Sequence, residues 1–304
     1  MATEKNSWNP KSKLELIVLS KLTAVKSDNK SKMSILDKYN KRAKEINSLL
    51  CVGLDSDYKK IPDRFLTNEM PQFAFNKWLI EETQEYAAAF KINIAFYEAR
   101  GDQGLKELKE TMEYLRVYYP DIFLICDSKR ADIGNTNQGY VNELFDWFGF
   151  DAITLHPYLG GEALQPFLDR KDKGCIILCR TSNPGAGELQ DLELRKPFNS
   201  AQSKQLWQIV AEKVYYDWNK NNNCMLVVGA TYPEEMKKIR NIAGDMTFLV
   251  PGIGAQGGSV AKVMKAGLNS QNLGLIINSS RGIIFSENPK KEAQRLCEEI
   301  RRFM

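Results

Sequence analysis

Short apolar segments alternate with amphipathic segments along most of the chain, from residue 49 onwards. Eight apolar segments have the length of buried strands: Leu49–Leu54, Ala89–Phe96, Ile122–Cys126, Ala152–Leu155, Cys175–Cys179, Met225–Val228, Thr247–Val250 and Leu273–Ile277. The intervening segments predict helices over Gly104–Tyr118, Thr136–Phe148, Ala201–Trp218, Pro233–Ile242 and Val260–Ala266, with a final helix over Lys290–Phe303. Strands that alternate with helices predict βαβ units and a parallel sheet.

Eight such units over about 255 residues match a (β/α)8 barrel, also called a TIM barrel, of the α/β class. An open, doubly wound sheet is the alternative, because the pattern alone does not show that the sheet closes. No linker divides the chain after the first 32 residues, so we expect residues 33–304 to form a single catalytic domain. The longest connection, roughly residues 181–200, begins with a polar Gly/Pro-rich stretch that is typical of a loop over a site.

The first 32 residues differ from the rest of the chain in charge. They hold seven lysines and three acidic residues, which accounts for the whole net charge of +4 and leaves residues 33–304 neutral. Their apolar patch, Leu16–Leu19, is too short for a signal-peptide core or a membrane span. We therefore expect residues 1–32 to be a flexible extension, with no membrane partner. The absence of a basic stripe in the body argues against a nucleic-acid partner.

Cysteine and histidine content limits the possible chemistry. Six cysteines are spread along the chain without a secretory signal, so we expect free, buried thiols and a cytoplasmic protein. Cys175 and Cys179 do not have the spacing of a zinc site. The single histidine, His156, rules out a metal site with several histidine ligands and makes a histidine-dependent hydrolase a poor fit. An enzyme built on this chain would rely on Lys and Asp for proton transfer.

The most informative segment is Asp127–Thr136, which follows the third predicted strand and is rich in charge. Residues two apart in a strand share a face, so Asp127 and Lys129 are expected to project the same way, with Asp132 a few residues on. Burying such charges is costly unless each has a partner or a task. A surface ion pair is the commoner outcome for an isolated Asp-x-Lys. Whether these charges form such a pair or part of an active site depends on the residues that the rest of the chain places beside them.

Polar residues also follow the other predicted strands. They are Asp55 after the first strand, Lys91 and Asn93 in the second, His156 after the fourth, and Thr181 and Ser182 after the fifth. Barrel enzymes carry their chemistry at the C-terminal ends of the strands, where these residues would meet Asp127 and Lys129. The sequence therefore predicts one active site at this rim.

A glycine-rich loop follows the seventh strand. Gly252, Gly254 and Gly257 match the dinucleotide-binding fingerprint, but that motif belongs after a first strand and needs an acidic residue at the end of the next. A dehydrogenase is therefore disfavoured. A glycine-rich loop followed by the start of a helix can bind a phosphate through backbone N–H groups. The loops after strands seven and eight are the usual phosphate site of a barrel. Arg281 can bind the same phosphate with two hydrogen bonds. Plain turn glycines and a surface arginine are the alternative.

Taken together, these motifs resemble the orotidine 5′-phosphate decarboxylase family, from about Ser48 to the C-terminus. The matching segments are Cys51–Asp55, Lys91–Glu98, Asp127–Thr136, Pro157–Gly160, Thr181–Gly185, Val228–Thr231, Pro251–Gly258 and Ser280–Gly282. Ser128 and Ala131 stand where relatives often have Ala and Gly. His156 stands where a histidine is not typical, and we interpret it as a packing or supporting residue.

The resemblance implies conversion of orotidine 5′-phosphate to uridine 5′-phosphate and CO2, the last step of pyrimidine nucleotide synthesis, without a metal or organic cofactor. It implies an alternating catalytic array of Lys91, Asp127, Lys129 and Asp132, in which Lys129 protonates C6 of the pyrimidine. It also implies a homodimer, in which Asp132, Ile133 and Thr136 reach the neighbouring subunit's site. The substrate contacts that it implies are Asp55 and Lys91 to the ribose, Ser182 to the pyrimidine, Gln256 and Arg281 to the phosphate, and further Asn93, Thr181 and Pro251.

Three alternatives fit parts of the same pattern. A related barrel that shares Asp-x-Lys-x-x-Asp acts on sugar phosphates through a Mg²⁺-bound enediolate. An aldolase would instead form a Schiff base on a lysine such as Lys129. A nucleotide-binding barrel without catalytic activity is the third, and the intact set of Asp127, Lys129 and Asp132 argues against it.

Overall fold

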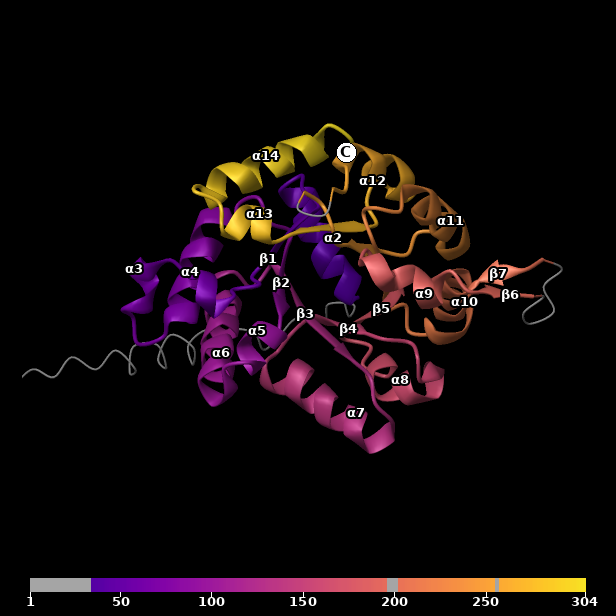
Figure 1. Cartoon of the computed structure of the whole chain (residues 1–304), viewed down its shortest axis with the longest axis horizontal. Coiled ribbons are helices and arrows are strands. Elements are labelled where there is room, and N and C mark those ends of the chain that lie inside the picture. The colour runs from indigo at the N-terminus through magenta and orange to yellow at the C-terminus, as the bar shows by residue number, and fades with distance from the viewer. Residues whose placement is uncertain (1–33, 196–201, 255–256) are drawn as a thin grey trace, which may run out of the picture. The chain divides into compact units, whose positions relative to one another are not determined.

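The computed structural model describes residues 34–195, 202–254 and 257–304. Eight parallel strands close into a barrel, and helices surround them (Figure 1). The barrel strands are β1 (Leu50–Gly53), β2 (Ala89–Asn93), β3 (Phe123–Arg130), β4 (Ala152–Leu155), β5 (Gly174–Arg180), β8 (Cys224–Val228), β9 (Phe248–Val250) and β10 (Leu275–Ser279). Pairing of β1 with β10 closes the sheet, which confirms the (β/α)8 barrel and excludes the open sheet.

The described helices connect and cover these strands. The longer ones are α2 (Ile35–Glu45), α4 (Pro71–Thr83), α6 (Gly101–Tyr118), α7 (Gly134–Val141), α8 (Gly160–Leu168), α10 (Leu206–Glu212), α11 (Pro233–Ala243), α12 (Val260–Gly267) and α14 (Pro289–Arg301). The short ones are η1 (Tyr58–Lys60), α3 (Asp63–Leu66), α5 (Ala95–Glu98), η3 (Pro184–Ala186), α9 (Gly187–Gln190) and α13 (Arg281–Ile284). Two π-helical segments, η2 (Asn142–Trp147) and η5 (Lys213–Trp218), extend α7 and α10.

Three predictions about the bounds of elements were wrong. The helix expected over Ala201–Trp218 begins only at Leu206, because Lys204 and Gln205 form a strand. The second strand was expected to continue to Phe96, but it ends at Asn93, whose side chain accepts a hydrogen bond from the N–H of Ala95 and turns the chain into α5. The connection over residues 181–200 was expected to be a loop. Its described part contains η3, α9 and β6 (Glu193–Leu194), which pairs with β7 (Lys204–Gln205) in a small antiparallel sheet.

The interior of the barrel and the layer between strands and helices form one hydrophobic core. The strands are buried along nearly their whole length, as expected for a parallel sheet covered on both faces. All six cysteines are buried and free, which confirms that they act as small apolar residues. Within the described residues, no helix has both the length and the apolar character needed to cross a membrane.

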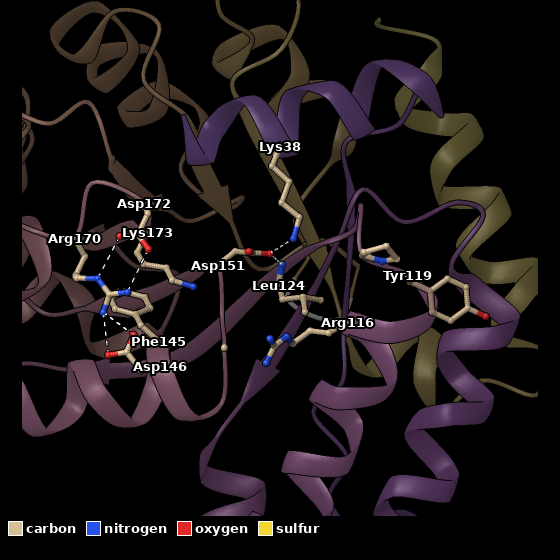
Figure 2. Close-up of a pocket in the computed structure, with 12 residues that line it drawn as sticks. Lys38, Arg116, Tyr119, Leu124, Phe145, Asp146, Asp151, Arg170, Asp172 and Lys173 are labelled. Atoms are coloured by element: carbon tan, nitrogen blue, oxygen red, sulfur yellow. Dashed lines mark hydrogen bonds and ion pairs between the residues drawn. The ribbon is translucent and has the colours of Figure 1, made fainter. Parts of the chain in front are cut away.

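The N-terminal end of the barrel is closed by polar contacts. Tyr39 of α2 donates a hydrogen bond to the carbonyl of Leu275 at the start of β10 (2.6 Å). A pocket of about 480 Å³ lies at the start of β3, β4 and β5 (Figure 2). In it Asp151 accepts hydrogen bonds from Lys38 Nζ (2.6 Å) and from the N–H of Leu124 (2.9 Å). These contacts tie elements together at the end of the barrel that is opposite the predicted site, where polar residues usually serve stability.

Candidate active site

Four charged side chains meet at the C-terminal ends of β1, β2 and β3. Lys91 Nζ lies 3.3 Å from Asp127 Oδ2 and 3.5 Å from Asp55 Oδ1. Lys129 Nζ lies 2.6 Å from Asp127 Oδ1. The side chain of Lys91 is 4% exposed and that of Asp127 is 14% exposed, whereas that of Lys129 is 51% exposed. These four residues, which we call the charged array, lie together as the sequence predicted, with Lys129 at its open end.

Burial and charge oppose each other within the array. Burial alone would raise the pKa of Asp127, but the ammonium groups of Lys91 and Lys129 and the hydroxyl of Thr154 outweigh it and hold that pKa well below its usual range. Burial alone would lower the pKa of Lys91, but the carboxylates of Asp55 and Asp127 outweigh it and raise that pKa. Asp127 and Lys91 are therefore both ionised at neutral pH, and each has a partner of opposite charge.

Lys129 reaches Asp127 through an irregular piece of backbone. We expected the two side chains to share a face by simple strand alternation, but the pairing of β3 with β4 shifts between Cys126 and Arg130. Lys129 lies in this bulge and has a φ of 45°, in the left-handed region that non-glycine residues rarely adopt. The predicted proximity is thus correct, but the alternation argument for it was wrong.

Thr154 is a site residue that the sequence analysis missed. It is buried in β4, and its hydroxyl donates a hydrogen bond to Asp127 Oδ1 (2.9 Å) and accepts one from the N–H of Lys129 (2.9 Å). Nothing in the sequence marks it, because a threonine within an apolar run is ordinary in a strand.

Buried side chains fix the loop that carries Asp55. Tyr97 donates a hydrogen bond to the carbonyl of Leu54 (3.0 Å), and the hydroxyl of Ser56 donates one to Asn76 Oδ1 (2.5 Å). Asn76 Nδ2 in turn donates to the hydroxyl of Tyr97 (2.8 Å). Both neighbours of Asp55 are therefore held by one buried network, which limits the positions open to its carboxylate.

Asp132, Ile133 and Thr136 lie where β3 leads into α7. The side chain of Asn137 accepts a hydrogen bond from the N–H of Asp132 (2.7 Å) and donates one to its carbonyl (2.5 Å). The carboxylate of Asp132 accepts a hydrogen bond from the N–H of Ile133 (2.7 Å). Ile133 is 62% exposed, and Thr136 is exposed as well. Within the described residues of one chain, Asp132 makes no ion pair with the charged array.

The remaining residues predicted near the ring lie at the ends of β2 and β5. Asn93, the last residue of β2, pairs in register with Asp127. Gln190 of α9 holds Thr181, because its amide accepts a hydrogen bond from the N–H of Thr181 (3.0 Å) and donates one to its hydroxyl (2.8 Å). Ser182 is partly exposed beside the end of β8, so close to Gly229 that a side chain there would collide with it.

The predicted phosphate loop follows β9 and has an unusual backbone. Gly252, Gly254 and Gly257 have φ values of 100°, 76° and 80°, a region that favours glycine. Pro251, at the start of the loop, accepts a hydrogen bond from the N–H of Ala230 (2.9 Å). Gln256 lies outside the described residues.

Arg281 begins α13, directly after β10, which is the neighbour of β9 in the barrel. Its side chain is exposed, and no carboxylate of the described residues pairs with it. The glycine loop and Arg281 thus lie at the same end of adjacent strands, as the sequence predicted.

His156 supports the neighbouring loop. Its backbone N–H donates a hydrogen bond to the carbonyl of Arg130 (3.1 Å), and its ring Nε2 lies 3.0 Å from the carbonyl oxygen of Ala131. This position agrees with a supporting role. Among the described residues, no group of three or more His, Cys, Asp or Glu side chains has the arrangement of a metal site.

Comparison with known proteins covers most of the chain. A relative from Cellvibrio japonicus (strain Ueda107), named orotidine 5′-phosphate decarboxylase, is 45% identical over 264 residues, which is 86% of this chain and 93% of the relative. A relative of the same name from Christiangramia forsetii is 46% identical over 81% of this chain and 88% of its own length.

A solved structure and a family model point to the same family as these relatives. The structure of Leishmania donovani OMP decarboxylase is 39% identical, has a TM-score of 0.78 and is matched over 89% of this chain and 99% of that chain. The model described as "Orotidine 5'-phosphate decarboxylase / HUMPS family" matches residues 48–296, which include every described residue of the candidate site. The chain therefore belongs to the orotidine 5′-phosphate decarboxylase / HUMPS family.

Proposed function

We propose that the chain is a carboxy-lyase that converts orotidine 5′-phosphate to uridine 5′-phosphate and CO2, with Lys129 as the proton donor to C6. The observation that carries the proposal is the charged array, in which Lys129 extends from the buried Lys91–Asp127 pair at the open end of the barrel. Family membership and relatives of that name at 45–46% identity support it.

The reaction leaves a localised negative charge on C6 when CO2 departs. An ammonium group fixed beside that carbon stabilises charge that exists only in the transition state, which is the kind of binding that accelerates a reaction. Lys129 has an ammonium group held 2.6 Å from Asp127 and a side chain exposed enough to approach a substrate. It can then transfer a proton to the same carbon.

Asp127 faces the substrate carboxylate in this proposal. Its low pKa keeps it charged, and two negative charges about 4 Å apart repel by about 4 kcal/mol at an effective dielectric constant of about 20. This repulsion disappears when CO2 leaves. We assign the larger effect to Lys129, because stabilisation of the developing charge acts directly on the transition state.

The remaining substrate contacts follow from the ends of the other strands. We assign Asp55 and Lys91 to the ribose hydroxyls, and Asn93, Thr181 and Ser182 to the side of the site that holds the ring. Pro251 and Gln256, from the loop after β9, and Arg281 complete the site at the phosphate. The phosphate is remote from C6, so its binding energy would orient the ring rather than act on the breaking bond.

We further propose a homodimer in which Asp132, Ile133 and Thr136 complete the partner's site. In support, Ile133 and Tyr158, from the adjacent loops after β3 and β4, are 62% and 84% exposed. Large apolar side chains exposed in the loops of neighbouring strands are candidates for an interface. Asp132, which makes no ion pair with the array of its own chain in the described residues, would then serve the neighbouring array.

Mixing two inactive variants tests the shared site. Lys129→Ala and Asp132→Ala are each expected to be nearly inactive alone. After subunit exchange, half of the dimers are mixed, and each mixed dimer has one intact site, so the mixture should recover about a quarter of wild-type activity. No recovery after exchange, verified by size and by tagged subunits, would exclude a shared site.

A Mg²⁺-dependent sugar-phosphate enzyme is the second candidate, because a barrel of that kind shares the pattern formed by Asp127, Lys129 and Asp132. An absorbance assay of orotidine 5′-phosphate loss, with and without EDTA, separates the two. We expect full activity in EDTA, whereas abolition by EDTA would contradict the proposed mechanism. Borohydride added with substrate should not label Lys129, since no Schiff base forms.

We also propose that residues 33–304 are the catalytic domain, that residues 1–32 are an accessory extension, and that the enzyme is cytoplasmic. Residues 1–32 lie outside the described part of the chain. A chain that begins at Met33 should keep the kcat and the melting temperature of the full chain. A tenfold loss of kcat would show that the extension takes part in the site.

A further inference from the structure

We propose that Thr154 is a positioning residue that fixes both the backbone and the ammonium group of the reactive lysine through a single hydroxyl. The inference rests on the proposed function, because it concerns Lys129 as the proton donor. It adds a residue that lies outside the motifs on which the family resemblance is based.

The first part of the argument is the backbone of β3. Between the pairs Cys126–Ile153 and Arg130–Leu155, β3 has two more residues than β4, so a regular ladder cannot form there. The N–H of Lys129 donates instead to the hydroxyl of Thr154 (2.9 Å). The left-handed φ of Lys129 is a conformation that persists only where the surroundings enforce it.

The second part is the carboxylate that orients the lysine head. The hydroxyl of Thr154 donates to Asp127 Oδ1 (2.9 Å), and the same oxygen accepts from Lys129 Nζ (2.6 Å). One hydroxyl group therefore contacts the backbone of Lys129 and the group that holds its ammonium end. Thr154 is 1% exposed, so water does not readily reach its hydroxyl. Loss of the hydroxyl would therefore leave the backbone N–H of Lys129 without a partner.

The chain offers matched variants for a test. Thr154→Val keeps the shape of the side chain and removes the hydroxyl, whereas Thr154→Ser keeps the hydroxyl and removes a methyl group. Ser128→Ala is the control, because Ser128 lies in the same bulge but its hydroxyl donates to the backbone carbonyl of Thr154 (3.1 Å) rather than to Asp127 or Lys129. It removes a hydroxyl without touching Asp127 or Lys129.

The phosphate and ribose groups are held elsewhere, so Thr154→Val should affect kcat and spare KM. We expect kcat to fall by about 10- to 100-fold, or about 1.4–2.7 kcal/mol, as for the loss of a hydrogen bond to a charged group. KM and the affinity for uridine 5′-phosphate should change by less than about threefold, because the residues proposed to bind the phosphate and the ribose are unchanged. Thr154→Ser and Ser128→Ala should keep kcat within about threefold of wild type.

Equal kcat in Thr154→Val and wild type would overturn the inference, and so would an equal loss in Thr154→Ser or a rise in KM alone. If Thr154→Val does not fold, Thr154→Ala replaces it in the comparison with Thr154→Ser. If the wild-type protein does not consume orotidine 5′-phosphate, the proposed function fails. The crystal structure of Thr154→Val then still tests the geometry, since Lys129 should leave the left-handed region, and an unchanged Lys129 would refute the positioning role.

Discussion

Replacement of Lys129 by alanine is the most direct test of the proposed chemistry. The ammonium group of Lys129 is held 2.6 Å from Asp127, and in the proposed mechanism it lies beside the carbon on which charge develops. A unit charge about 4 Å from a developing carbanion contributes about 4 kcal/mol at an effective dielectric constant of about 20. That energy corresponds to about a thousandfold in rate, and loss of the proton donor adds to it. We therefore expect kcat to fall by at least about a thousandfold.

Binding of the product should survive this change. Asp127 keeps Lys91 and Thr154 as partners, and the predicted phosphate contacts lie at the ends of other strands. The assay is the absorbance change of orotidine 5′-phosphate, together with calorimetric titration of uridine 5′-phosphate. Lys77→Ala is the control, because Lys77 is a half-exposed lysine of α4 whose contacts, with Glu81 and the ring of Tyr114, lie outside the candidate site. Retention of more than a few per cent of wild-type kcat in Lys129→Ala would refute the role of Lys129 as proton donor.

Three further predictions concern binding, stability and pH. Arg281→Ala should raise KM for orotidine 5′-phosphate by at least about tenfold, as for a lost charged hydrogen bond, and leave the slow turnover of the nucleoside orotidine unchanged, which steady-state kinetics can measure. Arg240→Met removes hydrogen bonds to four backbone carbonyls near the starts of β9 and β10. Urea unfolding should show a free energy of unfolding that is lower by about 3 kcal/mol, while kcat stays unchanged. The depressed pKa of Asp127 means that its contribution to stability is complete above its unfolded pKa of about 3.9 and is lost as pH falls further. The difference in unfolding free energy between wild type and Asp127→Asn should therefore be constant from about pH 7 to pH 5, and a decrease within that range would contradict the reasoning.

The eight strands were predictable because they are buried on both faces, whereas closure of the sheet into a barrel was not visible in the pattern alone. Ala152–Leu155 was predicted with its observed bounds, since a largely apolar run between polar turns that is this short has the length of a strand and not of a helix. Helix α4 was not predicted, because the face that it buries includes Gln72, Asn76 and Thr83. These polar residues interrupt the apolar period, and two of them serve the hydrogen-bond network beside the Asp55 loop.

The candidate site was predictable as a set of residue types at strand ends, but its local geometry was not. The left-handed backbone of Lys129 has no signal in the sequence, because neither glycine nor asparagine stands at that position. The role of Thr154 depends on a contact between β3 and β4 that spans 27 residues. A pattern read along one strand cannot show such a contact.

Closure of the barrel has a consequence for folding during synthesis. The seam between β1 and β10 joins residues such as Leu50 and Ile277, which are 227 positions apart. At about 5–20 residues per second, a ribosome needs about 10–45 s to make the chain between them. During that time β1 has an unpaired edge, while β1, β2 and β3 can already bring Asp55, Lys91 and Asp127 together. The charged half of the site can thus form early in the life of the nascent chain, whereas the half that contains Arg281 is completed last.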